Sequence, residues 1–167
     1  FVGYYGCRRA SAAGVSGDAG GGKSEAPGVW SDPRLDMMKE EWFQGKRCLD
    51  IGCNVGIMTM SMAYKFRCES MEGIDCDAKL IAQARRVKRA IQWPESPETH
   101  SQAKVYFKTA DAVGSSLLEA CGEDASMGGK YDLISCLSVT KWVHLNHGDE
   151  GLLKLLRRIW FLLKEGG

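Results

Sequence analysis

The chain has 167 residues, about one domain, and its 22 Lys and Arg against 21 Asp and Glu leave a formal net charge of +1. This balance provides no overall field for a nucleic-acid or membrane surface, so any site for a polyanion must be a local cluster. Hydrophobic residues make up 44% and charged residues 26%, which excludes a chain that is disordered throughout. No apolar run reaches the roughly 18 residues of a membrane helix, and the N-terminus has no signal-peptide pattern.

Composition divides the chain into three parts. Residues 1–9 form an aromatic and basic element, residues 10–30 are small and rich in glycine, and a regular pattern runs over 31–167. We expect 10–30 to be a flexible loop because it has few groups to bury, and 1–9 to dock back onto the domain. The chain lacks an initial Met and stops soon after a helical pattern, so we expect a fragment that misses sequence at both ends.

The seven cysteines have no C-x-x-C spacing, and their number is odd. We therefore expect no metal site. Four of them lie in or beside apolar runs that are typical of strands, namely Cys48, Cys53, Cys76 and Cys136. This predicts small buried thiols in a reducing compartment.

From residue 31 the apolar spacing predicts helices that alternate with strands. Asp32 and Pro33 begin the first helix. In chain order we expect a helix at 34–43, a strand at 48–51, a helix at 55–66, a strand at 71–75, a helix at 78–93, a strand at 104–109, a helix at 115–120, a strand at 131–137 and a helix at 151–164. Such alternation implies right-handed crossovers, so the predicted fold class is α/β, a three-layer sandwich around a mostly parallel sheet.

Distinctive residues follow the first two predicted strands, at the sheet edge where ligands of such folds bind. A glycine turn follows the first strand, and the second ends in Asp75, whose carboxylate could accept hydrogen bonds from both hydroxyls of a ribose. Asp50 precedes Gly52, and the next glycine is Gly56, which departs from G-x-G-x-x-G. Because an acid repels a pyrophosphate but not a cation, this favours S-adenosylmethionine over NAD. A purely structural corner is the alternative.

The third and fourth predicted strands also end in polar residues. Asp111 and Ala112 could reach an adenine edge, or Asp111 could cap the next helix, and the spacing does not decide. The segment 137–151 concentrates side chains that can hold phosphate or stack on a base, namely Lys141, Trp142, His144 and His147. A helix-capping turn is the alternative, with acids at 149 and 150 beginning the last helix.

Three segments resemble one family: DIGCNVG at 50–56, GIDCD at 73–77 and LSVTKWVHLNHGDEG at 137–151. They are similar to the RNA 5′-methylphosphate capping methyltransferases of the bicoid-interacting-protein-3 family, and residues 4–8 and 34–43 resemble that family's N-terminal elements. The resemblance implies a Rossmann-like class I methyltransferase fold, S-adenosylmethionine as methyl donor, and transfer to the terminal (gamma) phosphate of an RNA with a phosphorylated 5′ end.

The resemblance also implies a role for each matching residue. Arg34 would pair with the carboxylate of the donor and Asp75 would hold its ribose. The other cofactor-binding candidates are Tyr4, Asp50, Gly52, Asn54, Gly56, Cys76, Asp111, Ala112 and Leu137. The candidates that face the RNA phosphate are Lys141, Tyr5, Arg8 and His144. A phosphate oxygen is already anionic, so the chemistry needs alignment rather than a general base.

The chain departs from the family in places. Cys7 stands where the family usually has Tyr, His147 stands where Trp is common, and the family continues with further strands beyond Gly167. We therefore expect C-terminal strands of the domain to be missing.

The resemblance further implies a nuclear protein, with a cytoplasmic one as the alternative, and a monomeric catalytic domain, with RNA-binding accessory proteins as possible partners. Other functions stay open: a 5′-monophosphate RNA methyltransferase, a small-molecule or protein methyltransferase, or a non-catalytic RNA-binding scaffold. The basic surface of the helix at 78–93 could touch the RNA backbone, although such surfaces are more often simply solvated.

Overall fold

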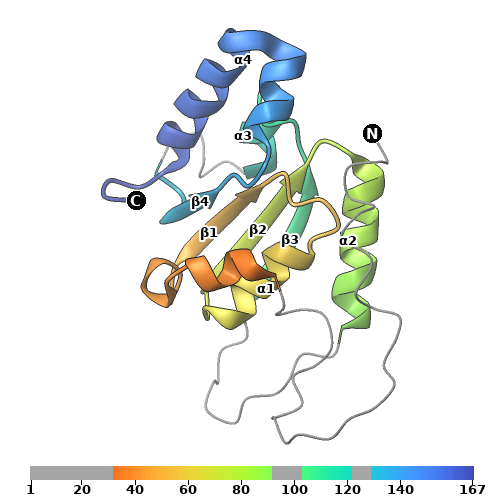
Figure 1. Cartoon of the computed structure of the whole chain (residues 1–167), viewed down its shortest axis with the longest axis vertical. Coiled ribbons are helices and arrows are strands. Elements are labelled where there is room, and N and C mark those ends of the chain that lie inside the picture. The colour runs from red at the N-terminus through yellow and green to blue at the C-terminus, as the bar shows by residue number, and fades with distance from the viewer. Residues whose placement is uncertain (1–31, 92–102, 122–128) are drawn as a thin grey trace, which may run out of the picture.

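A computed structural model describes residues 32–91, 103–121 and 129–167 of the chain (Figure 1). Its centre is a four-stranded parallel sheet in the order β3-β2-β1-β4. The strands are β1 (Arg47–Ile51), β2 (Ser70–Asp75), β3 (Lys104–Thr109) and β4 (Leu133–Ser135). The predicted α/β class with a parallel sheet is therefore confirmed.

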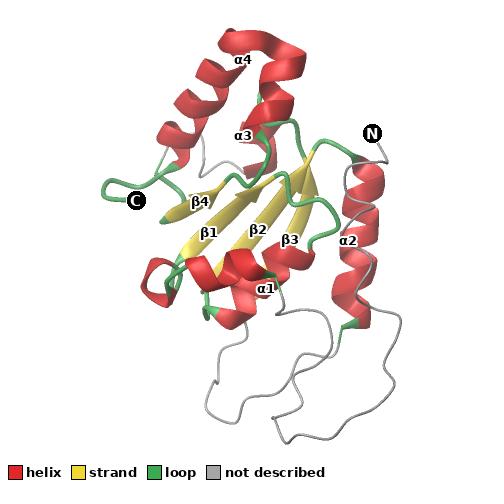
Figure 2. Cartoon of the chain, viewed as in Figure 1, coloured by secondary structure: helices red, strands yellow, loops and turns green. Residues whose placement is uncertain are grey.

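Helices cover both faces of this sheet (Figure 2). They are the 3₁₀ helices η2 (Pro33–Met37) and η3 (Glu40–Trp42) and the α-helices α1 (Ile57–Lys65), α2 (Ala78–Ala90), α3 (Ser116–Cys121) and α4 (Thr140–Leu162). One buried cluster joins the sheet to η2, α1 and α2, and the other joins it to α3 and α4. On β1, Cys48 belongs to the first cluster and Leu49 to the second, because neighbouring residues of a strand face opposite sides.

The segment 34–43 differs from the single helix that its apolar spacing predicts. It forms two 3₁₀ helices, separated where Met38 takes an extended conformation (ψ 143°). Leu35 and Phe43 are the buried side chains, whereas Trp42 is 41% exposed. The start is as predicted, because the Asp32 carboxylate accepts the backbone N–H of Arg34. The prediction of one continuous helix is wrong because burying Leu35 and Phe43 together requires the chain to bend between them.

Three boundaries near the other helices also differ. α2 ends at Ala90 because Ile91 is extended. β4 is shorter than predicted, and Tyr131 pairs with Leu163 in an isolated bridge. The last helix begins at Thr140, eleven residues before the predicted start at Gly151, and is interrupted by Gly148 (φ 61°, ψ −162°). The N-terminal element 1–9 and the expected loop 10–30 lie outside the described residues.

Most of the described cysteines are buried free thiols, but the predicted burial of Cys76 is wrong. Cys48 and Cys53 are buried, Cys136 is half-buried, and Cys76 is exposed because it follows the last residue of β2. Across the described ranges, no three His, Cys, Asp or Glu side chains lie close enough together to hold a metal ion. None of the described helices is both long and apolar enough to cross a membrane.

A half-buried carboxylate connects the sheet to α3. Glu72 of β2 accepts from Lys130 Nζ at 2.8 Å, from Lys108 Nζ at 3.0 Å and from the Tyr131 hydroxyl at 3.1 Å. The same two ammonium groups donate to the last carbonyls of α3, Lys108 to Ala120 at 2.7 Å and Lys130 to that of residue 121 at 2.5 Å. One carboxylate therefore holds the C-terminus of α3 against two strands.

Candidate functional site

The turn after β1 is a glycine corner, here defined as residues 52–56. The backbone N–H groups of Gly52 and Cys53 both donate to the Ile74 carbonyl, at 2.8 and 2.9 Å, so the corner folds over the end of β2. Gly52 has φ +77°, a conformation that side chains disfavour, and an added Cβ would lie 2.2 Å from Cγ2 of Val139. Glycine at position 52 thus brings the corner into direct contact with the segment after β4.

Asp75 closes the corner from the end of β2. Its Oδ2 accepts the backbone N–H of Asn54 at 2.9 Å, and its Oδ1 accepts that of Asp77 at 3.0 Å. Its backbone carbonyl accepts the N–H of Ala110, which follows β3. Each carboxylate oxygen keeps a further lone pair for a ligand hydroxyl. Three strand ends therefore meet at Asp75.

Asp50 lies beneath the corner and is 3% exposed. Thr59 Oγ1 donates to one of its oxygens at 2.6 Å, and Ser135 Oγ donates to the other at 2.7 Å. Burial raises the pKa of this carboxyl, while the hydrogen bonds from Ser135 and Thr59 and the positive charge of Arg34 act in the opposite direction. Arg34 itself donates from Nη2 to Asp32 at 2.6 Å. Asp50 is therefore a fixed, buried hydrogen-bond acceptor rather than an exposed ligand.

Sequence reasoning missed Thr59 and Ser135. Ser135 could have indicated a buried polar contact, because it places a hydroxyl group in the otherwise apolar run of β4. Its partner Asp50 is 85 residues away in the chain, so only the pairing of β1 with β4 brings the two together.

Asp111 and Cys76 lie on the β3 side of the corner. Burial and the negative charges of Asp75 and Asp111 raise the pKa of the Cys76 thiol, because these groups are close together. The Asp111 carboxylate accepts the N–H of Val113 at 2.9 Å, so it shapes the loop before α3 instead of capping that helix. Ala112 belongs to the same loop, and its carbonyl accepts from Arg158 of α4 at 3.1 Å.

The segment after β4 begins at Leu137, which packs against the first buried cluster. The helical turn from Thr140 then directs Val143 into the core and leaves Lys141 exposed. Among the described residues, no side chain pairs with the Lys141 ammonium, so it is available to an anion. The alternative of a helix-capping turn does not hold here, because most of this segment is the first part of α4.

His144 is directed along its own helix. Its Nε2 lies 2.9 Å from Asp149 Oδ1, across the interruption at Gly148. The structure thus brings Gly52, Asp75 and the residues after β4 together at one sheet edge, with Lys141 on the adjoining turn, while His144 contacts Asp149 rather than the corner. Tyr4, Tyr5 and Arg8 lie outside the described residues.

A comparison with solved structures agrees with this arrangement of the sheet. A S-adenosylmethionine-dependent methyltransferase from Clostridium acetobutylicum matches with a TM-score of 0.57 and 20% identity, over 83% of this chain and 47% of that one. The fold is therefore the Rossmann-like fold of these methyltransferases, as the sequence predicts.

Curated relatives add a match in sequence. A probable RNA methyltransferase of Arabidopsis thaliana is 40% identical, over 81% of this chain and 52% of its own length. The human 7SK snRNA methylphosphate capping enzyme is 32% identical, over 81% of this chain and 26% of its own length. The chain thus spans about half or less of these relatives. The family model of Bicoid-interacting protein 3 matches residues 131–167, which include the segment after β4. The chain is therefore similar to the Bicoid-interacting protein 3 family in the segment after β4, and to RNA methyltransferases over most of its length.

Proposed function

We propose that the chain is the donor-binding part of an RNA methyltransferase that transfers a methyl group from S-adenosylmethionine to the terminal phosphate at the 5′ end of an RNA. One observation carries the proposal: Gly52, Asp75 and the segment after β4 meet at one sheet edge, next to the exposed ammonium of Lys141. The names of the relatives, which include snRNA methylphosphate capping enzymes, support an RNA substrate.

The donor set fits S-adenosylmethionine. Asp75 has acceptor capacity left for the two ribose hydroxyls, and Asp111 lies beside it for the base. Asp50 places a carboxyl group beneath the corner, whose acceptor oxygens suit a cationic ligand, and Arg34 next to it is the proposed partner for a carboxylate. The remaining proposed contacts are Tyr4, Asn54, Gly56, Cys76, Ala112 and Leu137.

Bound S-adenosylmethionine supplies a methyl group activated by a sulfonium. The phosphate oxygen needs no deprotonation. The residues of the chain therefore have to hold the phosphate with one oxygen aligned to the methyl group. Lys141 is proposed to bind non-reacting phosphate oxygens as a point charge. Tyr5 and Arg8 are proposed to complete this side of the site, and His144 to join them once its contact with Asp149 opens.

Further properties follow from this function. Methylation of small nuclear RNAs, which the relatives' names describe, supports a nuclear location for this protein. We propose a monomeric catalytic domain that accessory RNA-binding proteins assist. The N-terminal element 1–9 is proposed as the part of the substrate site that reaches the domain across the segment 10–30.

A labelled-methyl assay tests the proposal with one RNA that carries a 5′ triphosphate, a 5′ monophosphate or a 5′ hydroxyl. We expect transfer to a phosphorylated end and none to the hydroxyl end, and the two phosphorylated arms identify the preferred end. Lys141→Met should lower transfer roughly tenfold or more while the Kd for the donor, measured by calorimetry, stays within about twofold. Lys154→Met, an exposed lysine further along α4, is the matched control. Unchanged transfer by Lys141→Met contradicts its role, and transfer to the hydroxyl end contradicts the substrate.

A further inference from the structure

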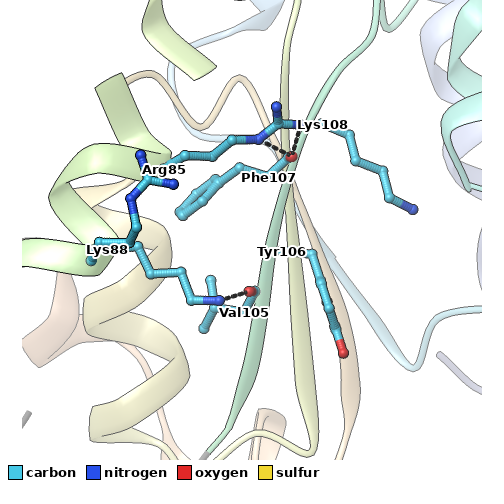
Figure 3. A pocket seen from close by; sticks show the side chains of 7 residues that line it. Arg85, Lys88, Val105, Tyr106, Phe107 and Lys108 are labelled. Carbon is cyan, nitrogen blue, oxygen red and sulfur yellow. Dashed lines mark hydrogen bonds between the residues drawn. The ribbon is translucent and has the colours of Figure 1, made fainter. Parts of the chain in front are cut away.

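A shallow groove of about 410 Å³ runs along the free edge of β3, beside α2 (Figure 3). Its walls include the cationic side chains of Arg85 and Lys88 on one side and Tyr106 on the other. Arg89 also lines the groove. The groove lies outside the corner, but Phe107 connects the two. A Cβ at Gly56 would be 2.4 Å from the ring of Phe107, so this strand residue contacts the corner with its ring and the groove with its backbone.

Basic side chains occupy the free edge of this strand. Arg85 donates from Nε at 3.1 Å and from Nη2 at 2.7 Å to the Phe107 carbonyl. Lys88 donates from Nζ at 2.5 Å to the carbonyl of residue 105. These are the acceptors that an added β-strand would need, so the edge is closed to a peptide that binds by extending the sheet.

The positive charge in the groove is not neutralised by carboxylates. Among the described residues, none of the basic side chains of α2 forms an ion pair with an acid. Lys108 differs, because Glu72 pairs with it at 3.0 Å. An arginine or lysine that donates to a carbonyl keeps its full charge, so the groove attracts an anion even where its hydrogen bonds are used.

An exposed aromatic ring lies beside these charges. Tyr106 is 48% exposed, and Lys88 Nζ lies 5.8 Å from the centre of its ring. An exposed ring flanked by cations is the combination that binds single-stranded nucleic acid, because bases stack on the ring while cations track the phosphates. A base in a duplex cannot stack in this way, so the ring favours an unpaired strand.

We propose that this groove binds a single-stranded stretch of RNA, with a base on Tyr106 and backbone phosphates at Arg85 and Arg89. The proposal rests on the proposed function only for the choice of RNA as the nucleic acid. It gives the enzyme a second contact with its substrate, away from the 5′ phosphate and on the strand that supports the glycine corner.

The test measures binding of a fluorescent 5′-hydroxyl single-stranded RNA of about 20 nucleotides to the whole chain, without methyl donor and at several salt concentrations. Arg89→Gln should lower the slope of log K against log salt by about 1. Tyr106→Ala should weaken binding about fivefold or more. Two controls remove like groups elsewhere: Arg86→Gln, on α2 but outside the groove, and Trp160→Ala, an exposed aromatic of α4. Both should change binding by less than about twofold, and circular dichroism confirms that every variant is folded.

Several results would overturn the proposal. One is equal loss in Arg86→Gln and Arg89→Gln, which would mean attraction by general charge. Others are no binding by the unaltered chain, equal binding of duplex RNA, or displacement of the RNA by an equimolar acidic peptide. Because the probe has no 5′ phosphate and no donor is present, failure of methyl transfer leaves this measurement unaffected, and failure here leaves the proposed reaction standing.

Discussion

Two regions meet at the carboxyl edge of the sheet, and they are built differently. At the glycine corner, backbone N–H groups donate to Asp75 at 2.9 and 3.0 Å, and hydroxyl groups donate to the buried Asp50 beneath it at 2.6 and 2.7 Å. The first turns of α4 are mostly exposed, with Lys141 on the surface and His144 paired only with an exposed acid. Neighbouring groups therefore hold the corner at several points, whereas Lys141 and His144 have few contacts with the rest of the domain.

This difference matches two binding tasks. A small ligand bound at many points gains affinity from a site that is already ordered, because little entropy is lost on binding. The 5′ phosphate of a long RNA can approach the site in different orientations, and long cationic side chains can adjust to each of them. The following predictions test whether the corner is the rigid half and the helix the adaptable half.

The largest effect is expected for Gly52→Ala. The positive φ and the contact with Val139 should together cost roughly 2–4 kcal/mol in unfolding free energy and weaken donor binding more than tenfold. Urea denaturation and calorimetry measure these two quantities. Gly45→Ala is the control, because Gly45 also has positive φ (+67°) but no atom within 4 Å of an added Cβ. Equal losses in both variants would show that the contact with Val139 has no weight.

A smaller effect is expected for Asp75→Asn. An amide has only one acceptor oxygen, so it cannot hold the Asn54 and Asp77 N–H groups and two ribose hydroxyls together. We expect a loss in donor affinity of about tenfold or more, measured by calorimetry. Asp77→Asn, which alters the residue that caps α2, should leave donor affinity nearly unchanged. Full affinity in Asp75→Asn would remove the ribose contact from the proposal.

Asp50 should make stability depend on pH in an unusual direction. Burial raises its pKa, so between the ordinary value of 3.8 and the folded-state pKa the folded protein binds more protons than the unfolded one. Its contribution to unfolding free energy therefore falls as pH rises through that window. Relative to the unaltered protein, Asp50→Asn should gain stability as pH rises from below about 4 to 7, as read from urea denaturation at each pH.

Asp132 provides the opposite slope as a control. Its burial acts to raise the pKa, but hydrogen bonds from Lys164 and the Arg47 backbone outweigh this and hold the pKa below its ordinary value. Relative to the unaltered protein, Asp132→Asn should therefore lose stability as pH rises through the acidic range towards about 4, and the deficit should stay constant above that. A flat difference curve for Asp50→Asn would mean that its carboxyl titrates normally.

The smallest effect is expected for His144→Ala. Its ring and Asp149 are 55% and 91% exposed, so their contact should contribute less than about 0.5 kcal/mol to stability. Val143→Ala, one residue earlier but 7% exposed, should cost about 1.5 kcal/mol because two buried methyl groups are lost. Thermal denaturation compares them. A loss above about 1 kcal/mol in His144→Ala would show that the helix is not the adaptable half.

Local pattern predicted the corner well. β3 has the predicted bounds, and β1 and β2 each begin one residue earlier than expected, because glycines and apolar runs mark them directly. The place of Asp75 and Gly52 at one edge follows from strand order alone. The hydroxyls that hold Asp50 did not follow, since a serine and a threonine give no sign of a partner that is far away in the chain.

The helical segments were harder to predict for a physical reason. At 34–43, Leu35, Met38 and Trp42 fit helical spacing, but burial selects Leu35 and Phe43, and the backbone bends to satisfy both. At 140–147 the sequence pattern predicted no helix, although the buried Val143 anchors this turn of α4 to the core. Periodicity reports which residues can share a face, and tertiary packing decides which of them do.

The shortest of the described α-helices, α3, depends on the single carboxylate of Glu72. α3 has six residues, too few to persist in isolation, and its last carbonyls are held by Lys108 and Lys130. Burial would raise the pKa of Glu72, but hydrogen bonds and charges of these lysines hold it below its ordinary value of 4.5. Amide exchange in α3 should therefore be insensitive to mild acid and become fast only when Glu72 takes up a proton. Protonation of Glu72 then controls the local opening of α3, which lies on the face of the sheet opposite α1 and α2.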